Sequence, residues 1–378
     1  MELRLPTLLV LLLGFLLLPS CSKPKPHLSA LASEPDWSRL SASAPSLLPG
    51  DSANSPGKGE GHYWREHPLR RTSPERPLAG LRIAIDPGHL GGRWARMEYR
   101  WFLPSEGKVI AEGDLTLWVA KKLERRLSEW GAEVFLVRKA AEPATPLPPE
   151  AWRGLAEKYL DEGKNLNLES RDNFQELSKE EQIRRVAEML FYRVAEIRAR
   201  AALVNAVFRP DLTICLHFNA GDWGNPEAPR TAKVNHLHVL VPGAAQPEEW
   251  ALDDVRFEMV QRMLEGTYRV EIPLAESIAD ALAASTGLPP ALVPGGAVQK
   301  IGKNPYVWAR NLLANRLYES PTVFIEAYVM NHPETIARIA AGDYEGARKI
   351  SEKSFTSIYT DYAEGVARGI LDYYSPVK

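Results

Sequence analysis

The sequence predicts an α/β fold, a mostly parallel twisted sheet of about five to six strands with helices on both faces. Short apolar runs, rich in β-branched residues, alternate with longer segments in which apolar residues recur every three or four positions. The first such unit is a strand at 81–86, a helix at 115–130 and a strand at 133–138. A strand–helix–strand unit of this kind is typical of parallel sheets.

The later segments continue the alternation. Ser178 and Glu181 form a capping-box pattern, which predicts the start of a long helix that continues to about Val207. Gly287 ends a further helix that begins at Leu274. The other predicted elements are strands at 212–217, 235–241 and 322–326, an acidic helix at about 247–265, and two C-terminal helices at about 333–341 and 344–374.

Composition limits the classes of function. The chain has 378 residues, of which 45% are hydrophobic, so a sizeable core can be buried. The formal net charge is −2 and no block of Lys and Arg stands out, which gives no support for nucleic acid as a partner. The cysteines are Cys21 and Cys215, and Cys215 lies in an apolar run that indicates a small buried hydrophobe.

Residues 1–21 resemble a lipoprotein-type signal peptide. Leu5 to Leu18 is almost entirely apolar, and at about 14 residues it is short for a membrane span. It ends in Leu-Pro-Ser-Cys, which resembles the lipobox of bacterial lipoproteins and predicts a lipid anchor on Cys21. Pro19 is unusual at its position, so an ordinary secretory signal is the alternative. We expect a periplasmic protein that is anchored to a membrane, with the outer membrane favoured over the inner.

The rest of the chain divides into a tether and one domain. Residues 22–78 are rich in Ser, Pro, Gly and charge and show no hydrophobic periodicity, which predicts a disordered tether. Residues 79–378 carry all of the strand and helix patterns and are expected to form the domain. A Pro-rich, then polar insertion interrupts that domain at about 140–178.

Three strands of the predicted sheet end in side chains that can bind a metal or transfer a proton. The first strand runs into a Pro-Gly turn and His89, the strand LTICL runs into His217, and TVFI runs into Glu326. Because the carboxyl ends of parallel strands meet at one edge of a sheet, we expect these side chains to converge. Glu112 precedes the first crossover helix and is expected near the same edge.

Two imidazoles and a carboxylate are the ligand set of a catalytic zinc site whose fourth position is left to water. A second carboxylate, not bound to the metal, is then needed to take the proton of that water and pass it to the leaving nitrogen. His89, Glu112, His217 and Glu326 supply this set. Each of them taken alone could instead be a hydrogen-bonded structural residue.

Several motifs in combination resemble the zinc-dependent N-acetylmuramoyl-L-alanine amidases. They are DPGH with a trailing Gly-Gly, EGDLTL, a long helix with Arg200 and Asn205 before CLHFNA, and PTVFIEAYVMNHPE. The match runs from about Leu81 to Glu334. The resemblance implies an enzyme with Zn²⁺ as cofactor and peptidoglycan as substrate. Such an enzyme cleaves the amide between the lactyl group of muramic acid and the first alanine of the stem peptide.

The resemblance also assigns roles to individual residues. It implies that His89, Glu112 and His217 are the zinc ligands. It implies that Glu326 is the catalytic glutamate. Five more residues fall on recurrent family positions, with structural hydrogen bonding as the alternative to substrate contact: Arg200, Asn205, Asn219, Arg310 and Asn331. Of these five, Asn219 and Arg310 are the predicted substrate-binding residues.

The sequence departs from the family near the first histidine. Leu90 interrupts the run of glycines that follows His89. The gap from His89 to Glu112 is wider than the family leads us to expect, which leaves Glu98 and Glu106 as rival metal ligands. The insertion is also atypical and could shape the choice of substrate.

His236 and His238 are a second candidate pair of metal ligands. Two residues apart on a strand, they point to the same face. They begin their strand rather than end it, so we expect them at the opposite edge from the site, as core or surface histidines.

The leading hypothesis is therefore a zinc amidohydrolase that acts on peptidoglycan, expected to be a monomer. One alternative is a zinc peptidase that cuts within the stem peptide, and another is a non-catalytic lipoprotein that binds the cell wall. The acidic helix at about 247–265 could occlude the metal until an activator protein moves it.

Overall fold

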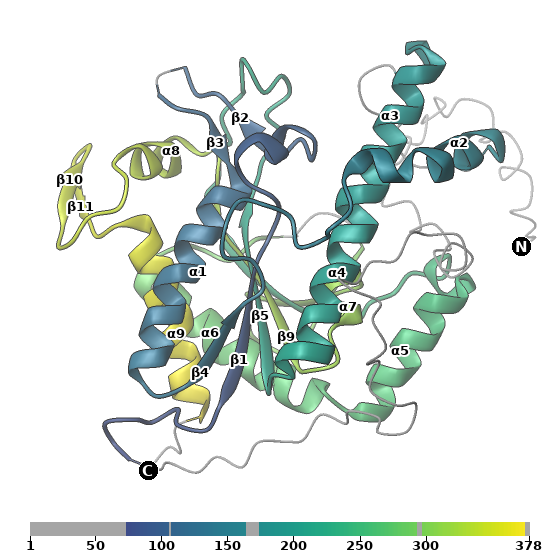
Figure 1. Ribbon diagram of the computed structural model, residues 1–378. Helices are drawn as coiled ribbons and strands as arrows, with labels where there is room; N and C mark the ends of the chain where they lie inside the picture. Colours follow the sequence, from purple (N-terminus) through teal and green to yellow (C-terminus); the bar gives the residue numbers. More distant parts are fainter. Residues whose placement is uncertain (1–72, 106, 164–173, 293–296, 375–378) are drawn as a thin grey trace, which may run out of the picture.

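The computed structural model describes residues 73–105, 107–163, 174–292 and 297–374 (Figure 1). The predicted signal peptide, the lipid anchor at Cys21 and nearly all of the predicted tether lie outside these residues, as does Glu106. Among the described residues, no helix is both long enough and apolar enough to span a membrane.

A seven-stranded sheet in the order β4-β1-β5-β9-β6-β8-β7 forms the centre of the domain. The strands are β1 (Arg82–Pro87), β4 (Glu133–Leu136), β5 (Leu212–Asn219), β6 (Leu237–Pro242), β7 (Val298–Lys300), β8 (Val307–Arg310) and β9 (Thr322–Val329). The first four strands in this order are parallel to one another. β6 then runs antiparallel to β9, β8 runs parallel to β6, and β7 runs antiparallel to β8. The predicted α/β fold is confirmed, and β7 and β8 extend the sheet beyond the strands that the sequence predicted.

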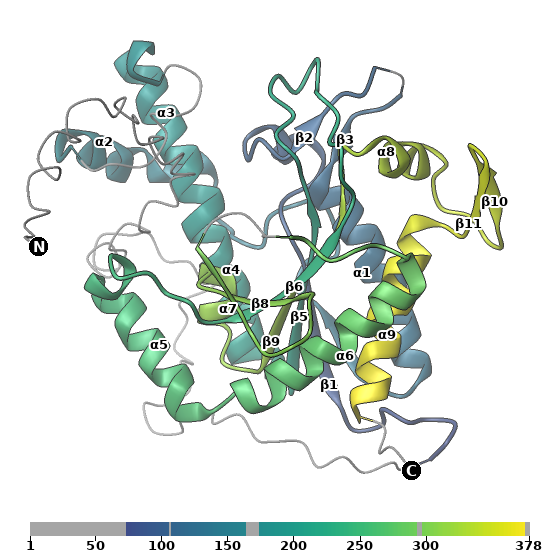
Figure 2. The ribbon, with the colours of Figure 1, turned by 180° about the vertical axis from the view of Figure 1, so that it is seen from behind.

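Helices cover both faces of this sheet (Figures 1 and 2). One face carries α1 (Glu112–Glu129), α6 (Tyr268–Thr286) and α9 (Ile358–Tyr374), and the other carries α4 (Glu196–Ala202) with α7 (Leu313–Leu317) and α5 (Asp253–Glu265) beyond it. Alternate residues of each strand point to opposite faces of the sheet, as the strand period of two requires. Ile83 and Ile85 of β1 pack with α1, α6 and α9, whereas Ala84 between them packs with Ala201 and Val204.

The long helix predicted at 178–207 is present but is not uniform. It consists of α3 (Lys179–Met189), a π-helical segment at Leu190–Ala195, α4, and a second π-helical segment at Leu203–Phe208. The Ser178 hydroxyl accepts a hydrogen bond from the backbone N–H of Glu181, so the predicted cap forms. Arg209 ends the helix in a left-handed conformation, with φ 46°.

The described residues of the segment at 140–178 pack against α3 and form a second core. It contains the 3₁₀ helices Pro149–Trp152 and Phe174–Glu176, and between them α2 (Arg153–Asp161). Trp152, Tyr159 and Phe174 pack there with Phe191 of the long helix. Leu90, from the loop after β1, is fully buried in the same core.

The remaining short elements lie in two segments of the chain. A 3₁₀ helix (Gly92–Arg96) and the hairpin β2 (Trp101–Phe102) and β3 (Ile110–Ala111) fill the long gap before α1. The predicted helix at 344–374 is wrong in its first half. Helix α8 (Pro333–Ala340) is followed by the hairpin β10 (Arg348–Ile350) and β11 (Lys353–Phe355), and only then by α9. Gly342 and Gly346 have positive φ, which interrupts the helical path.

Replacing Gly369 by Ala is expected to destabilise the fold, because α9 packs backbone to backbone against α6 at this glycine. A Cβ added at Gly369 would lie 2.4 Å from Ile278 Cα and 2.8 Å from Ile278 N. We expect Gly369→Ala to lower the free energy of unfolding, measured by urea denaturation, by about 1–3 kcal/mol.

Gly154 in α2 is the matched control, since a Cβ added there meets nothing within 4 Å. Gly154→Ala should leave stability unchanged or raise it by up to about 1 kcal/mol. Equal stability of the two variants would contradict the packing argument.

Candidate metal centre

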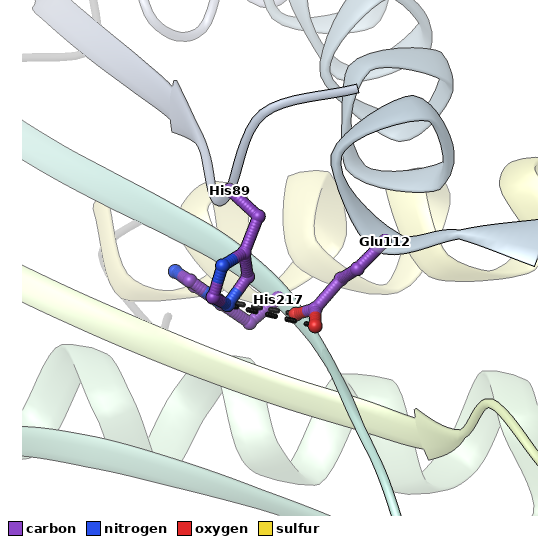
Figure 3. A group of neighbouring side chains, drawn as sticks. All are labelled: His89, Glu112 and His217. Atoms are coloured by element: carbon purple, nitrogen blue, oxygen red, sulfur yellow. Dashed lines mark hydrogen bonds and ion pairs between the residues drawn. The ribbon is translucent and has the colours of Figure 1, made fainter. Parts of the chain in front are cut away.

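Three predicted ligands converge at the carboxyl edge of the sheet (Figure 3). His89 follows β1, Glu112 is the first residue of α1, and His217 lies near the end of β5. One ligand atom from each lies within 4.8 Å of the other two. Glu112 Oε1 is 3.2 Å from His217 Nδ1, and Glu112 Oε2 is 3.5 Å from His89 Nε2. No other group of three potential ligands is present in the described part of the chain.

The backbone turn that presents His89 is left-handed, with φ 57°, a conformation that a residue with a side chain seldom adopts. Glu98 holds this turn, because its Oε2 accepts a hydrogen bond from Leu90 N (3.0 Å) and lies 2.9 Å from His89 Nδ1. Gly88 is required just before the turn, since a Cβ there would lie 2.2 Å from the His217 ring. The two histidines can therefore approach each other closely.

The contact with Glu98 also selects the tautomer of His89. A carboxylate only accepts hydrogen bonds, so the proton on the ring belongs to Nδ1 and the lone pair on Nε2 faces Glu112. Burial lowers the pKa of His89, against the opposing charges of Glu112 and Glu98. A neutral imidazole with a free lone pair is the form that binds a metal.

Glu112 is the charged centre of the site. Its side chain is fully buried, and its Oε1 accepts a hydrogen bond from Phe218 N at 3.0 Å. Burial alone would raise the pKa of Glu112, but Arg100 and then His89 outweigh it and hold the pKa far below its usual range. Glu112 therefore stays ionised.

Glu326 lies beside the three ligand residues on β9. It is the register partner of His217 on β5 and of His238 on β6. Burial, with a smaller contribution from the charge of Glu112, raises the pKa of Glu326 to about 7. Its buried Oε2 has no hydrogen-bond partner within the described residues. The site thus holds a second carboxylate that can gain and lose a proton near neutral pH.

Glu98 and Glu106 are the two carboxylates that the sequence left as alternatives to Glu112 as a metal ligand. Glu98 contacts His89 on the ring nitrogen that faces away from Glu112, so it orients the histidine instead of completing the group of three. Glu106 lies outside the described residues. The gap of more than twenty residues before Glu112 is taken up by the 3₁₀ helix and the β2–β3 hairpin.

The position expected for His236 and His238 is wrong. Because β6 runs antiparallel to β9, the start of β6 lies at the same edge of the sheet as the end of β9, and His238 is placed opposite Glu326. Burial lowers the pKa of His238 to about 3, so this histidine is neutral. Its Nδ1 lies 3.4 Å from Asn219 Nδ2. It belongs to the wall of the site and not to a second metal pair.

The two predicted substrate-binding residues end strands on opposite flanks of β9, the strand that carries Glu326. Asn219 ends β5, and its Oδ1 accepts a hydrogen bond from Ala220 N at 2.7 Å. Arg310 ends β8 and is half-buried, and its Nε has no hydrogen-bond partner in the described chain. Burial lowers the pKa of Arg310, against the attraction of Glu326.

Asn205 and Asn331 make structural hydrogen bonds. Asn205 Nδ2 donates to Leu317 O at 2.8 Å, and Asn331 Oδ1 accepts from Gly221 N at 2.9 Å. Both asparagines thus connect segments of backbone.

Arg200 holds the first ligand loop from the other face of the sheet. Its guanidinium donates to Asp86 Oδ1 and to Pro87 O, each at 2.9 Å, and to His89 O at 3.2 Å. Its Nε donates to Glu196 Oε1 at 2.7 Å. A single buried arginine therefore binds both the strand end and the residue that carries the first imidazole.

Arg100 is a site residue that sequence reasoning missed. Its Nε–H donates to His89 Nε2 at 3.2 Å, and the same nitrogen lies 2.8 Å from Glu112 Oε2. Nothing in the local sequence could have shown this, because Arg100 lies in the irregular segment before β2.

The acidic helix predicted at 247–265 consists of a 3₁₀ turn (Glu249–Ala251) and α5. Asp254 pairs with Arg198 of α4, and Glu258 pairs with Arg316 of α7. Figures 1 and 2 show α5 beside these helices and away from β2 and β3. Among the described residues, α5 makes no hydrogen bond or ion pair with the three ligand residues.

Comparison with known proteins gives one family and several solved structures. The family model described as N-acetylmuramoyl-L-alanine amidase matches residues 83–359. The N-acetylmuramyl-L-alanine amidase Ami1 from Mycobacterium smegmatis is 18% identical, with a TM-score of 0.41 over 79% of this chain and 98% of that one. An N-acetylmuramoyl-L-alanine amidase from Clostridium difficile 630 is 16% identical, with a TM-score of 0.39 over 78% and 96%. No curated protein matches the chain.

Replacing Arg200 by Met is expected to destabilise the fold strongly, because it removes the arginine that forms ion pairs with both Asp86 and Glu196 in the interior. Breaking a buried ion pair from one side costs about 3–5 kcal/mol, and we expect a loss of this size in the free energy of unfolding. Urea denaturation at pH 7.5 measures it.

Arg193 provides the control on the same continuous helix, since its side chain is exposed. Arg193→Met should change the free energy of unfolding by less than about 0.5 kcal/mol. A loss in Arg200→Met no larger than that would show that the buried network does not hold the ligand loop.

Proposed function

The chain belongs to the N-acetylmuramoyl-L-alanine amidase family and is an enzyme of that class, and from this membership we propose a zinc-dependent mechanism for it. Zn²⁺ is held by His89, Glu112 and His217, and Glu326 serves as the general base and then the general acid. The bond cleaved joins N-acetylmuramic acid to the first L-alanine of the peptidoglycan stem peptide. The observation that supports this proposal most directly is the convergence of the three ligand residues beside a separate carboxylate.

The donor set fits a zinc ion. Two imidazole nitrogens and one carboxylate oxygen, with an open fourth position, are the ligands of catalytic zinc sites. Glu112 Oε2 is a buried carboxylate oxygen that receives no hydrogen bond from the described chain, although Arg100 lies at ion-pair distance. A metal ion at this point would bind this anionic oxygen directly.

Each group at the site has a separate role in hydrolysis. Zinc, when bound, lowers the pKa of a water ligand and polarises the amide carbonyl. Glu326 takes a proton from the attacking water on its carboxylate and gives that proton to the nitrogen of the departing alanine, because a pKa of about 7 lets it do both near neutral pH. Glu98 keeps His89 oriented through the reaction, and Phe218 N does the same for Glu112.

Product analysis on purified peptidoglycan sacculi tests the proposed bond. We expect new amino groups on the first alanine of the stem peptide, with a matching lactyl carboxylate on muramic acid. New amino groups elsewhere in the stem would make the protein a peptidase, and sacculi that bind the protein without any cleavage would make it a non-catalytic cell-wall protein.

Glu326→Gln is expected to separate catalysis from metal binding. Without the general base the rate of hydrolysis should fall by about 10²–10⁴-fold, while elemental analysis finds the zinc content of the wild type. His89→Ala is the comparison variant and should lose both zinc and activity. If Glu326→Gln kept full activity, or lost its zinc as His89→Ala does, the role assigned to Glu326 would be wrong.

A further inference from the structure

The two ligand atoms on one side of the metal centre already have a cation beside them. The Nε of Arg100 contacts both His89 Nε2 and Glu112 Oε2. Glu112 has no exposed surface, so its charge needs a partner, whereas the Arg100 side chain is 29% exposed. A buried carboxylate without such a partner costs several kcal/mol of stability.

A guanidinium and a metal ion cannot share His89. Neutral imidazole has one nitrogen with a lone pair, and the Nδ1 position carries the proton that faces Glu98. The Nε2 lone pair either accepts the N–H of Arg100 or binds a metal ion. Binding of the metal therefore requires the Arg100 side chain to move from its present position.

We propose that Arg100 is a built-in competitor of the metal ion, which keeps His89 and Glu112 in place before loading and is displaced when the cation binds. This inference rests on the metal site of the proposed function. Only the side chain has to move. The backbone of Arg100 stays tied to the site, since its carbonyl accepts a hydrogen bond from Glu112 N at 3.0 Å and its N–H donates to Ala95 O at 3.0 Å.

A competitor and a supporting residue differ in the direction of their effect on metal affinity. Removing a competitor strengthens metal binding, because the metal no longer has to displace it. Removing a residue that merely supports the ligands weakens metal binding or leaves it unchanged. The measurement is therefore the affinity for zinc, which does not depend on activity.

The experiment uses Arg100→Met and, as control, Arg93→Met, an exposed arginine of the preceding 3₁₀ helix. The full-length proteins are stripped with EDTA and titrated with zinc against a chromophoric chelator at pH 7.5. We expect Arg100→Met to bind zinc at least about tenfold more tightly than the wild type, and Arg93→Met to match the wild type. In EDTA the melting temperature of Arg100→Met should fall by at least about 3 °C, and added zinc should remove this difference.

Wild-type or weaker zinc affinity in Arg100→Met overturns the inference. If that variant does not fold, ¹⁵N NMR of the wild-type arginine Nε–H groups tests the same point, with Arg100→Lys used to assign the signal. We expect this signal to shift when zinc is added, and an unchanged signal overturns the inference. A wild type and variant that both bind no zinc refute the proposed metal site as well, whereas equal zinc binding by both refutes only the role of Arg100.

Discussion

The burial of one ionised carboxylate constrains the whole site. Glu112 has no exposed surface, so each of its oxygens must be compensated by groups that the fold brings to it. Phe218 N and His217 come from β5, and His89 and Arg100 come from the two ends of the loop after β1. As the first residue of α1, Glu112 also lies at the positive end of the helix dipole. The first strand, the first helix and the central strand meet around this single charge.

The first ligand loop is held by three independent supports. Arg200 binds its carbonyl groups, Glu98 binds its imidazole and the next N–H, and the side chain of Leu90 is buried in the second core. These supports keep His89 in a left-handed conformation that it would not adopt alone. The departure from glycine at position 90 is therefore an anchor, and the insertion at 140–178 supplies the core in which it is buried.

The sequence predicted what depends on local pattern and on parallel strand direction. The positions of His89, His217 and Glu326 at one edge of the sheet could be predicted, because each follows the apolar run of a strand in the parallel part of the sheet. The sequence does not show that β6 reverses direction, and for that reason His238 was expected at the wrong edge. β7 and β8 have three and four residues, which is too short for a hydrophobic period to be visible. Arg100 reaches the ligands from irregular backbone, where no period exists.

Glu326 lies between two strands that run in opposite directions, because β5 is parallel to β9 and β6 is antiparallel to it. β5 and β9 run toward the edge that carries His217 and Glu326, whereas β6 begins at that edge, with His238 as its second residue. The segments that carry the proposed metal ligands and the segments that border the opposite flank are thus separate stretches of sequence. The buried charge of Glu112 therefore connects the segments on the β5 flank of the site, and the β6 flank is built from a later part of the chain.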